Sequence, residues 1–241
     1  MARTEASSPV VSVRSVMLPI EDPAVEAVSA AVHEPTRRRG AGVLLAPGAG
    51  GDLDDAGLVA LAEVMAGLGH PVVRSNLPHR EAGRRSVPRA DRSVTPYRQI
   101  LTAADAEVGA RRPWIVGGKS YGGRVASMAV AEGMEARGLV FYSYPLHPPG
   151  RPEKLRVDHW PHVGVPCLFL QGDRDPFCEL PLLEANVRKL PRRTTIHVVE
   201  GGDHSLRVSR AGSPTGTASA APDTIRSLRD VISAWLGSLR E

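Results

Sequence analysis

The sequence predicts one α/β domain built on a mostly parallel β-sheet with helices on both faces. Short apolar runs bounded by turn residues alternate along the chain with segments that carry apolar residues at helical spacing. The apolar runs are continuous rather than alternating, which is typical of parallel strands that are covered on both faces. The length of 241 residues fits one large domain, and a hydrophobic content of 42% is enough to fill its core.

The expected strands and helices follow one another in a regular order. The six clearest apolar runs lie at residues 42–51, 70–78, 113–120, 138–146, 166–172 and 194–200. Helical patterns lie at residues 55–69, 95–110, 121–133 and 225–239, and the last of these is amphipathic. Only about twenty residues separate the fourth apolar run from the fifth, which is too short for a large cap domain.

The two ends of the chain are less regular. We expect residues 1–40 to form an N-terminal tail and edge strands of the same domain, whose main part spans residues 41–241. VVSVRSVM (10–17) is a candidate edge strand, whereas AVEAVSAAV (24–32) fits either a strand or a short helix. Residues 207–224 are rich in Ser, Gly, Ala and Pro and predict a mobile surface loop.

Charge and cysteine content exclude several classes of function. The formal net charge is +4, and nearly all of the basic residues are arginines. Because no aromatic residues interleave with a basic stripe, we expect a solvated surface and no nucleic-acid partner. Cys167 and Cys178 form no C-x-x-C pair and no cluster with zinc spacing, so no metal site is expected.

Neither a secretion signal nor a membrane anchor is evident in the sequence. The N-terminus MARTEASSPVV lacks a long apolar segment, and no stretch of about 18 apolar residues occurs anywhere in the chain. We therefore expect a soluble cytoplasmic protein.

The stretch VGGKSYGG (116–123) is open to two interpretations. Gly118-Lys119-Ser120 resembles the end of a phosphate-binding P-loop, G-x-x-x-x-G-K-[ST]. That motif needs a glycine five positions before Gly118, where Pro113 stands, and the residues between them form an apolar strand. The spacing therefore disfavours nucleotide binding.

The same residues also fit G-x-S-x-G, the sharp strand-to-helix turn that presents a nucleophilic serine. Small residues two positions before and after Ser120, Gly118 and Gly122, would keep the strand and the helix from colliding. A strand is expected before the turn and a helix after it, as this turn requires. An ordinary glycine-rich turn with a capping serine is the alternative, so the decision depends on an acid and a histidine farther along.

An acid and a histidine follow Ser120 in the order that this chemistry needs. Asp175 lies directly behind the run at 166–172 and is the favoured acid, with Asp173 as the alternative. His204 follows the run at 194–200, so it belongs to the same edge of the sheet and is the favoured base. The competing histidines precede the acid or lie inside a strand: His147, His159, His162 and His197.

Backbone amides are expected to complete the site. The N–H of Tyr121, directly after the serine, would be one donor of an oxyanion hole. Gly48 and Ala49 belong to the glycine-rich loop after the first clear strand, and the Ala49 N–H would be the second donor. A simple strand-to-helix turn is the other interpretation of that loop.

In this order, GKSYGGR (118–124), GDRDPF (172–177) and GGDHS (201–205) resemble the α/β-hydrolase superfamily, and more narrowly its dienelactone-hydrolase-like branch. REAGRR (80–85) and YPLHPPGRPEKLR (144–156) are similar to the group around testis-expressed protein 30. The resemblance runs from about residue 40 to residue 206. It implies a single-domain α/β-hydrolase fold without a large cap domain.

We therefore expect a serine hydrolase that acts on an ester or thioester of a small acyl substrate, without a cofactor. Residues Arg80, Arg84, Arg85 and His147 could contact that substrate, and the arginines would favour an anionic acyl group. The alternative is a binding or scaffold protein with the same fold and little turnover. The sequence leaves the oligomeric state open.

Overall fold

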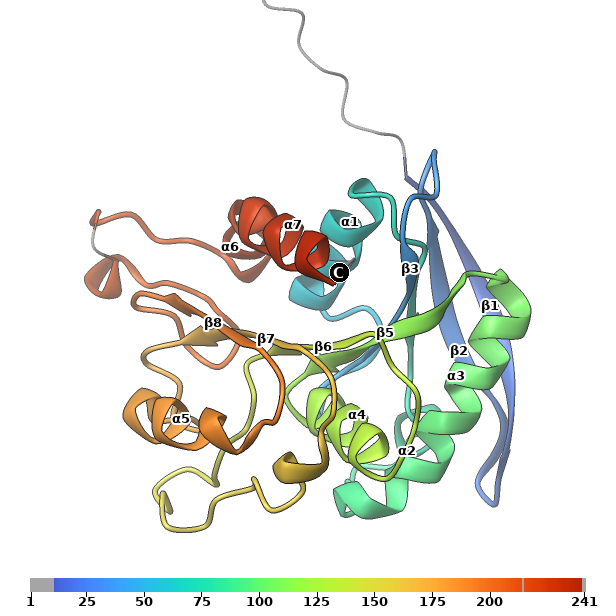
Figure 1. Cartoon of the computed structure of the whole chain (residues 1–241), viewed down its shortest axis with the longest axis horizontal. Coiled ribbons are helices and arrows are strands. Elements are labelled where there is room, and N and C mark those ends of the chain that lie inside the picture. The colour runs from blue at the N-terminus through green and yellow to red at the C-terminus, as the bar shows by residue number, and fades with distance from the viewer. Residues whose placement is uncertain (1–10, 214, 240–241) are drawn as a thin grey trace, which may run out of the picture.

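The computed structural model describes residues 11–213 and 215–239. Eight strands form one sheet in the order β1-β2-β4-β3-β5-β6-β7-β8 (Figure 1). From β4 to β8 in this order, all neighbouring strands run parallel, whereas β1 pairs with β2 and β2 with β4 in antiparallel fashion. The prediction of a mostly parallel sheet is confirmed.

The strands are β1 (Ser12–Asp22), β2 (Val25–Glu34), β3 (Ala41–Ala46), β4 (Val72–Ser75), β5 (Arg111–Lys119), β6 (Gly138–Tyr142), β7 (Cys167–Gly172) and β8 (Thr194–Val199). The α-helices are α1 (Ala56–Gly67), α2 (Pro78–Glu81), α3 (Val94–Val108), α4 (Tyr121–Ala131), α5 (Leu180–Asn186), α6 (Ala221–Ser227) and α7 (Arg229–Ser238). Short 3₁₀ helices are η1 (Ala90–Ser93), η2 (Trp160–His162), η3 (Val187–Lys189) and η4 (Arg210–Gly212).

Helices cover both faces of the sheet. Helices α1, α6 and α7 lie on one face, and α3, α4 and α5 lie on the other (Figure 1). Successive side chains of a strand point to opposite faces, so Leu44 and Val116 enter one core while Leu45 and Ile115 enter the other. All four are fully buried, which explains why the central strands are continuously apolar.

The N-terminal segment contributes two antiparallel strands to the edge of the sheet. The segment at 24–32, which fitted a strand or a helix, lies in β2 from Val25 onward, and Val28 and Val32 are buried in the core. β1 begins at Ser12, and the first ten residues of the expected tail lie outside the described residues.

The prediction of a single helix at residues 225–239 was wrong. The segment forms two helices, α6 and α7, with Leu228 between them. At this point the Leu228 N–H donates to the Ile225 carbonyl, which tightens the turn. Ile225, Leu228 and Ile232 still enter the same core, so the apolar spacing did not reveal the break. α6 also begins at Ala221, inside the loop predicted for 207–224.

The loop predicted for residues 207–224 contains regular backbone pairing. Val208 and Ser219 exchange two backbone hydrogen bonds, with N···O distances of 2.9 and 2.8 Å.

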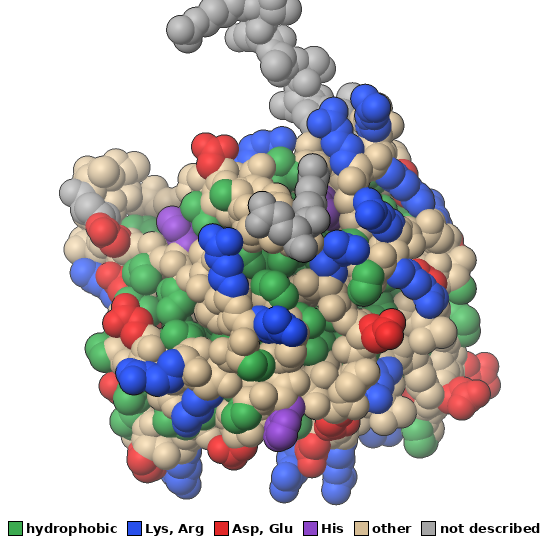
Figure 2. All heavy atoms as spheres, in the orientation of Figure 1, with side chains coloured by type: hydrophobic (Ala, Val, Ile, Leu, Met, Phe, Trp, Pro, Cys, Tyr) green, Lys and Arg blue, Asp and Glu red, His purple; other side chains and the backbone are tan. Residues whose placement is uncertain are grey.

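On the face seen in Figure 2, basic side chains are spread among acidic and apolar ones. No helix within residues 11–213 and 215–239 has the length and apolar character needed to cross a membrane.

The carboxyl ends of β3, β5, β7 and β8 meet at one edge of the sheet, because these strands are parallel. In open α/β sheets this is the edge where ligands bind. Between β6 and β7 the only helix in the described chain is η2, so no large cap domain covers this edge.

Candidate active site

Ser120 lies on a strained turn between β5 and α4. Its backbone φ is 49° and its ψ is −111°, a conformation that costs a residue with a side chain about 1–3 kcal/mol. Two backbone hydrogen bonds hold it: the Ser120 N–H donates to the Tyr142 carbonyl at 2.9 Å, and the Arg124 N–H donates to the Ser120 carbonyl at 3.0 Å. The predicted sharp turn is therefore present, with strand before and helix after.

Glycines allow β3 to pass directly against this turn. A Cβ added at Gly118 would lie 2.0 Å from the Ala46 carbonyl oxygen, and one at Gly122 would lie 2.3 Å from the same atom. Gly118 also has a φ of +143°. The close approach brings the loop after β3 to the serine, where a Cβ added at Gly48 would lie 3.7 Å from the Ser120 Cβ.

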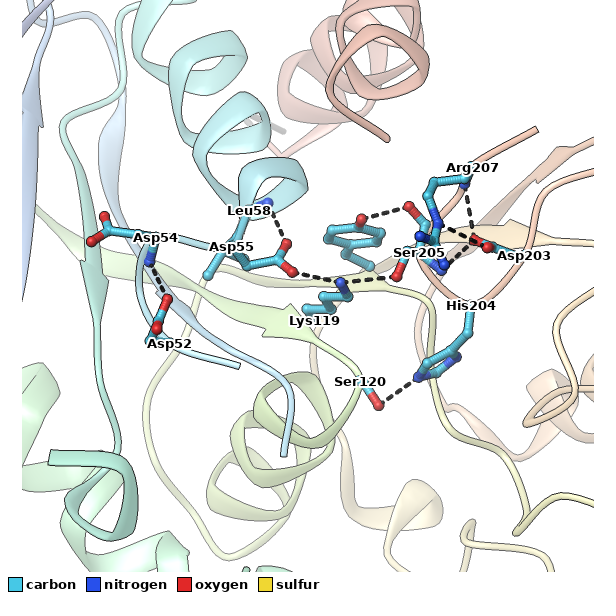
Figure 3. A network of polar contacts seen from close by, with 11 residues as sticks. Asp52, Asp54, Asp55, Leu58, Lys119, Ser120, Asp203, His204, Ser205 and Arg207 are labelled. Atoms are coloured by element: carbon cyan, nitrogen blue, oxygen red, sulfur yellow. Dashed lines mark hydrogen bonds and ion pairs between the residues drawn. The ribbon is translucent and has the colours of Figure 1, made fainter. Parts of the chain in front are cut away.

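His204 reaches Ser120 from the loop after β8 (Figure 3). Its Nε2 lies 2.8 Å from Ser120 Oγ, and its Nδ1 lies 2.7 Å from Asp175 Oδ2. Because a carboxylate only accepts hydrogen bonds, the ring proton lies on Nδ1 and Nε2 accepts the serine O–H. The three residues thus form one hydrogen-bonded chain across three loops.

The Asp175 side chain is fully buried. Its Oδ2 also accepts a hydrogen bond from Gln171 Nε2 at 2.6 Å, and its Oδ1 accepts one from the Phe177 N–H at 2.8 Å. Three donors therefore satisfy the carboxylate where water does not reach it. The Phe177 ring also packs on the His204 imidazole, with ring centroids 4.3 Å apart, a contact that the sequence analysis missed.

Asp173, the alternative acid, has a different partner. It is exposed, and its Oδ1 accepts a hydrogen bond from the Gly201 N–H at 2.6 Å. It joins the loops after β7 and β8, whereas Asp175 is the acid that contacts His204.

The two amides expected to form an oxyanion hole belong to the start of α4 and to the loop after β3. Tyr121 is the first residue of α4, where helix geometry leaves N–H groups without partners in the helix. Ala49 follows Gly48 in a turn closed by a hydrogen bond from the Gly51 N–H to the Gly48 carbonyl, at 3.1 Å. Both positions are compatible with the predicted role.

The Tyr121 side chain contacts the loop after α2. Its hydroxyl donates to the Pro88 carbonyl at 2.9 Å and lies 2.9 Å from Ser93 Oγ. Its ring meets the buried His79 imidazole edge-on, and burial lowers the pKa of His79. The residue after Ser120 therefore also anchors the arginine-rich loop.

The arginines of that loop differ in their surroundings. Arg80 forms an ion pair with Asp52, with an N···O distance of 2.9 Å. Arg84 and Arg85 are exposed, and neither has a carboxylate within 4.0 Å in the described chain. Of the three, these two are the cations without an ion pair in the described chain.

His147, also expected as a substrate contact, is buried and bonded to backbone through both ring nitrogens. Nδ1–H donates to the Pro148 carbonyl at 3.0 Å, and Nε2 accepts from the Glu179 N–H at 3.1 Å. Its own N–H donates to the Phe177 carbonyl at 3.0 Å. His147 thus holds the loop that carries Asp175.

Residues 39–233 match a family described as the alpha/beta hydrolase domain, and the chain belongs to this family. It is similar to a dienelactone hydrolase from Anabaena variabilis, with 17% identity over 95% of this chain and 98% of that one, and a TM-score of 0.70. A serine hydrolase without a lid from Xanthomonas campestris shows 17% identity over 93% and 94% of the two chains, with a TM-score of 0.66. An alpha-beta serine hydrolase homologue from Coxiella burnetii shows 13% identity over 97% and 99%, also at 0.66. These likenesses support the fold.

Within the described residues, no group of three or more His, Cys, Asp and Glu side chains is arranged to hold a metal ion. The residues that could do chemistry at this edge are a hydroxyl, an imidazole and a carboxylate. Together they can move a proton and form a covalent bond to an electrophilic carbon.

Proposed function

We propose that the protein is a serine hydrolase that cleaves a carboxylic ester or thioester through an acyl-enzyme. The observation that carries the proposal is the hydrogen-bonded chain from Ser120 through His204 to Asp175, at 2.8 and 2.7 Å. The positive φ of Ser120 at the start of α4 supports the same conclusion, because a strained turn of this kind raises a nucleophile above the sheet.

In the acylation step, Ser120 Oγ forms a bond to the substrate carbonyl carbon while His204 Nε2 takes the hydroxyl proton. The negative charge that develops on the carbonyl oxygen is stabilised by the N–H groups of Tyr121 and Ala49. Asp175 keeps the imidazole in the tautomer that accepts at Nε2 and stabilises the imidazolium. The bond to the alcohol or thiol then breaks, and His204 gives its proton to the leaving group.

Deacylation repeats these steps with water as the nucleophile. His204 takes a proton from the water, whose oxygen bonds to the acyl carbon, and Ser120 leaves with the proton returned by His204. The products are a carboxylic acid and the free serine. Neither step calls on a metal or a cofactor.

A fluorophosphonate probe tests this proposal, since it labels only activated serines. We expect wild type to be labelled and Ser120→Ala to lose all labelling. Ser127→Ala is the matched control, because Ser127 Oγ also lies 2.8 Å from a histidine nitrogen, that of His159, but is fully buried in α4. A folded wild-type protein that resists the probe would contradict the proposal and favour the scaffold alternative.

We further propose that the acyl group is anionic and meets Arg84 and Arg85. Both side chains lack ion-pair partners in the described chain and belong to the loop that Tyr121 anchors beside the serine. Neutralising both, by Arg84→Gln and Arg85→Gln, should raise KM for an acidic ester more than for a neutral one. Arg80→Gln is the control, because Asp52 already neutralises Arg80. Equal effects on the two esters would exclude this preference.

The shared stretches at 80–85 and 144–156 lead us to infer that the chain stands nearest to the group around testis-expressed protein 30 within its family. Arg80 and His147, which lie in these two stretches, have structural contacts here, with Asp52 and with the loop after β7. We therefore infer that both stretches shape the loops around the site.

A further inference from the structure

Lys119, the residue before the nucleophile, is joined to two other loops of the site. Its ammonium lies 2.7 Å from Asp55 Oδ2 and 3.1 Å from Ser205 Oγ (Figure 3). It also lies over the Tyr142 ring, 5.1 Å from the ring centroid. The Lys119 and Asp55 side chains are only 13% and 21% exposed. A contact of this kind is stronger than a pair on the open surface, because water screens it less.

On one side, this ammonium is linked to the loop after β3. Asp55 is the N-cap of α1, and its other carboxylate oxygen accepts a hydrogen bond from the Leu58 N–H at 3.0 Å. The carboxylate is therefore fixed at both oxygens. The loop that it ends begins at Pro47 and contains Ala49, a proposed oxyanion donor.

On the other side, the ammonium is linked to the loop that carries the base. Ser205 directly follows His204, and all three of its polar groups are bonded. Its N–H donates to Asp203 Oδ1 at 2.7 Å, its carbonyl accepts from the Tyr142 hydroxyl at 2.7 Å, and its Oγ accepts from Lys119. Besides the hydrogen bond between His204 and Ser120, the contact with Lys119 is the one hydrogen bond within the described residues that joins this loop to β5.

We propose that Lys119 is a positioning residue. It fixes the loop that carries His204, and the end of the loop 47–55 at Asp55, in their positions relative to Ser120. The inference rests on the proposed function, since it assigns Lys119 a part in the same reaction. Lys119 does not contact the reacting atoms: its ammonium points away from Ser120 Oγ toward Asp55 and Ser205 (Figure 3). It acts through the position of its neighbours.

Small displacements of the base have large kinetic effects. A shift of about 1 Å in a catalytic group can lower a rate by about 100-fold, because the reacting atoms leave their near-attack geometry. Without Lys119, Ser205 loses its link to β5, and the Asp55 carboxylate loses its counter-ion. The effect should therefore appear in kcat rather than in KM.

The test compares Lys119→Met with wild type, using steady-state hydrolysis of an activated ester and the rate constant of fluorophosphonate labelling. Methionine keeps the length of the side chain and removes its donors. We expect kcat and the labelling rate constant to fall by roughly 10- to 100-fold, with KM changed by less than about threefold. Ser205→Ala should lower kcat in the same way, and Ser205→Thr, which keeps the hydroxyl, should restore it.

A double variant separates the effect of the Lys119–Ser205 hydrogen bond from that of an unpaired charge on Asp55. Lys119→Met combined with Asp55→Asn removes both charges while an amide still caps α1. If Lys119 acts through Ser205, this double variant stays slow; recovery to the wild-type rate would instead assign the effect to the unpaired Asp55 carboxylate. Lys189→Met, an exposed lysine of η3, is the control and should match wild type.

Hydrogen exchange of residues 200–208 gives a readout that does not depend on turnover. Lys119→Met should exchange faster than wild type in this segment while its unfolding midpoint stays close to that of wild type. Unchanged labelling, kcat and exchange would overturn the positioning role. If wild type itself is not labelled, the proposed function fails, and hydrogen exchange alone decides whether Lys119 anchors this loop.

Discussion

Replacing Asp175 by Asn tests how the carboxylate controls the imidazole. In wild type, Asp175 Oδ2 accepts from His204 Nδ1 and Gln171 Nε2, while Oδ1 accepts from the Phe177 N–H. The new amide has one oxygen and one NH₂ group, so it cannot satisfy all three donors in their present orientation. Its orientation decides which tautomer His204 adopts.

Gln171 determines the favoured orientation. Its Oε1 is buried and has no hydrogen-bond partner in the described chain, so its amide can flip and accept from the new NH₂ group. The new oxygen then keeps the bond from the Phe177 N–H, and the second N–H of the new amide donates to His204 Nδ1. The imidazole proton moves to Nε2, which can no longer accept the proton of Ser120.

The expected result is a large loss of activity with a moderate loss of stability. Catalysis through the wrong tautomer costs about 10⁴-fold in kcat, which corresponds to about 5 kcal/mol of activation free energy. After the flip one polar group of the Gln171 amide stays buried without a partner, now the NH₂ group instead of the carbonyl oxygen, so the free energy of unfolding should fall by about 1–3 kcal/mol.

The assay pairs ester hydrolysis with urea unfolding of the same preparation. An Asp175→Asn variant that keeps its activity within about tenfold of wild type would refute this account of the tautomer. A loss of stability well above about 3 kcal/mol would refute the flip of Gln171, because it would mean that further buried donors were left unpaired. Asp173→Asn is the control, since Asp173 contacts the Gly201 N–H and not His204.

Three further predictions concern the fold. Gly122→Ala would place a methyl group 2.3 Å from the Ala46 carbonyl oxygen and should lower the free energy of unfolding in urea by about 1–3 kcal/mol. Gly237→Ala, whose methyl group would meet open space in α7, is the control and should be neutral or stabilising. Equal effects of the two changes would contradict the close approach of β3. Burial lowers the pKa of His159 to about 4, and the Arg124 charge adds to the shift. Because folding keeps His159 neutral, its contribution to stability is fully present above its unfolded pKa of about 6.5 and is lost as pH falls toward 4. Between pH 7 and 5 the free energy of unfolding of wild type should therefore fall by about 2 kcal/mol more than that of His159→Gln. Burial raises the pKa of both cysteine thiols, so neither should react with a disulfide reagent until the protein unfolds; rapid reaction of the native protein would contradict their burial.

Local chemistry explains why much of this protein was predictable from the sequence. The central strands are buried on both faces, so most of their residues had to be apolar, and the sequence predicted each of these strands. The turn at Ser120 needs glycine at Gly118 and Gly122, because β3 leaves no room for a Cβ at either position. Such requirements act on neighbouring residues and are therefore visible in sequence spacing.

Other features depend on partners that are distant in the sequence. The break at Leu228 leaves the apolar faces of α6 and α7 on one core, so the periodicity at 225–239 looked continuous. His147 and His204 both follow strands, and only the three-dimensional arrangement shows that both ring nitrogens of His147 form hydrogen bonds with backbone groups.

The sequence by itself determined the class of fold, the strand-turn-helix around Ser120 and the order in which Asp175 and His204 follow it. Tertiary structure decided which groups meet: it brings Asp175 rather than Asp173 to His204, pairs Arg80 with Asp52, and directs Lys119 to Asp55 and Ser205. The physical reason is that a strand or a turn is specified by its own residues and their spacing, whereas a hydrogen bond is specified by the position of two atoms. Those atoms come from loops up to 86 residues apart, and only the closed sheet sets their distance.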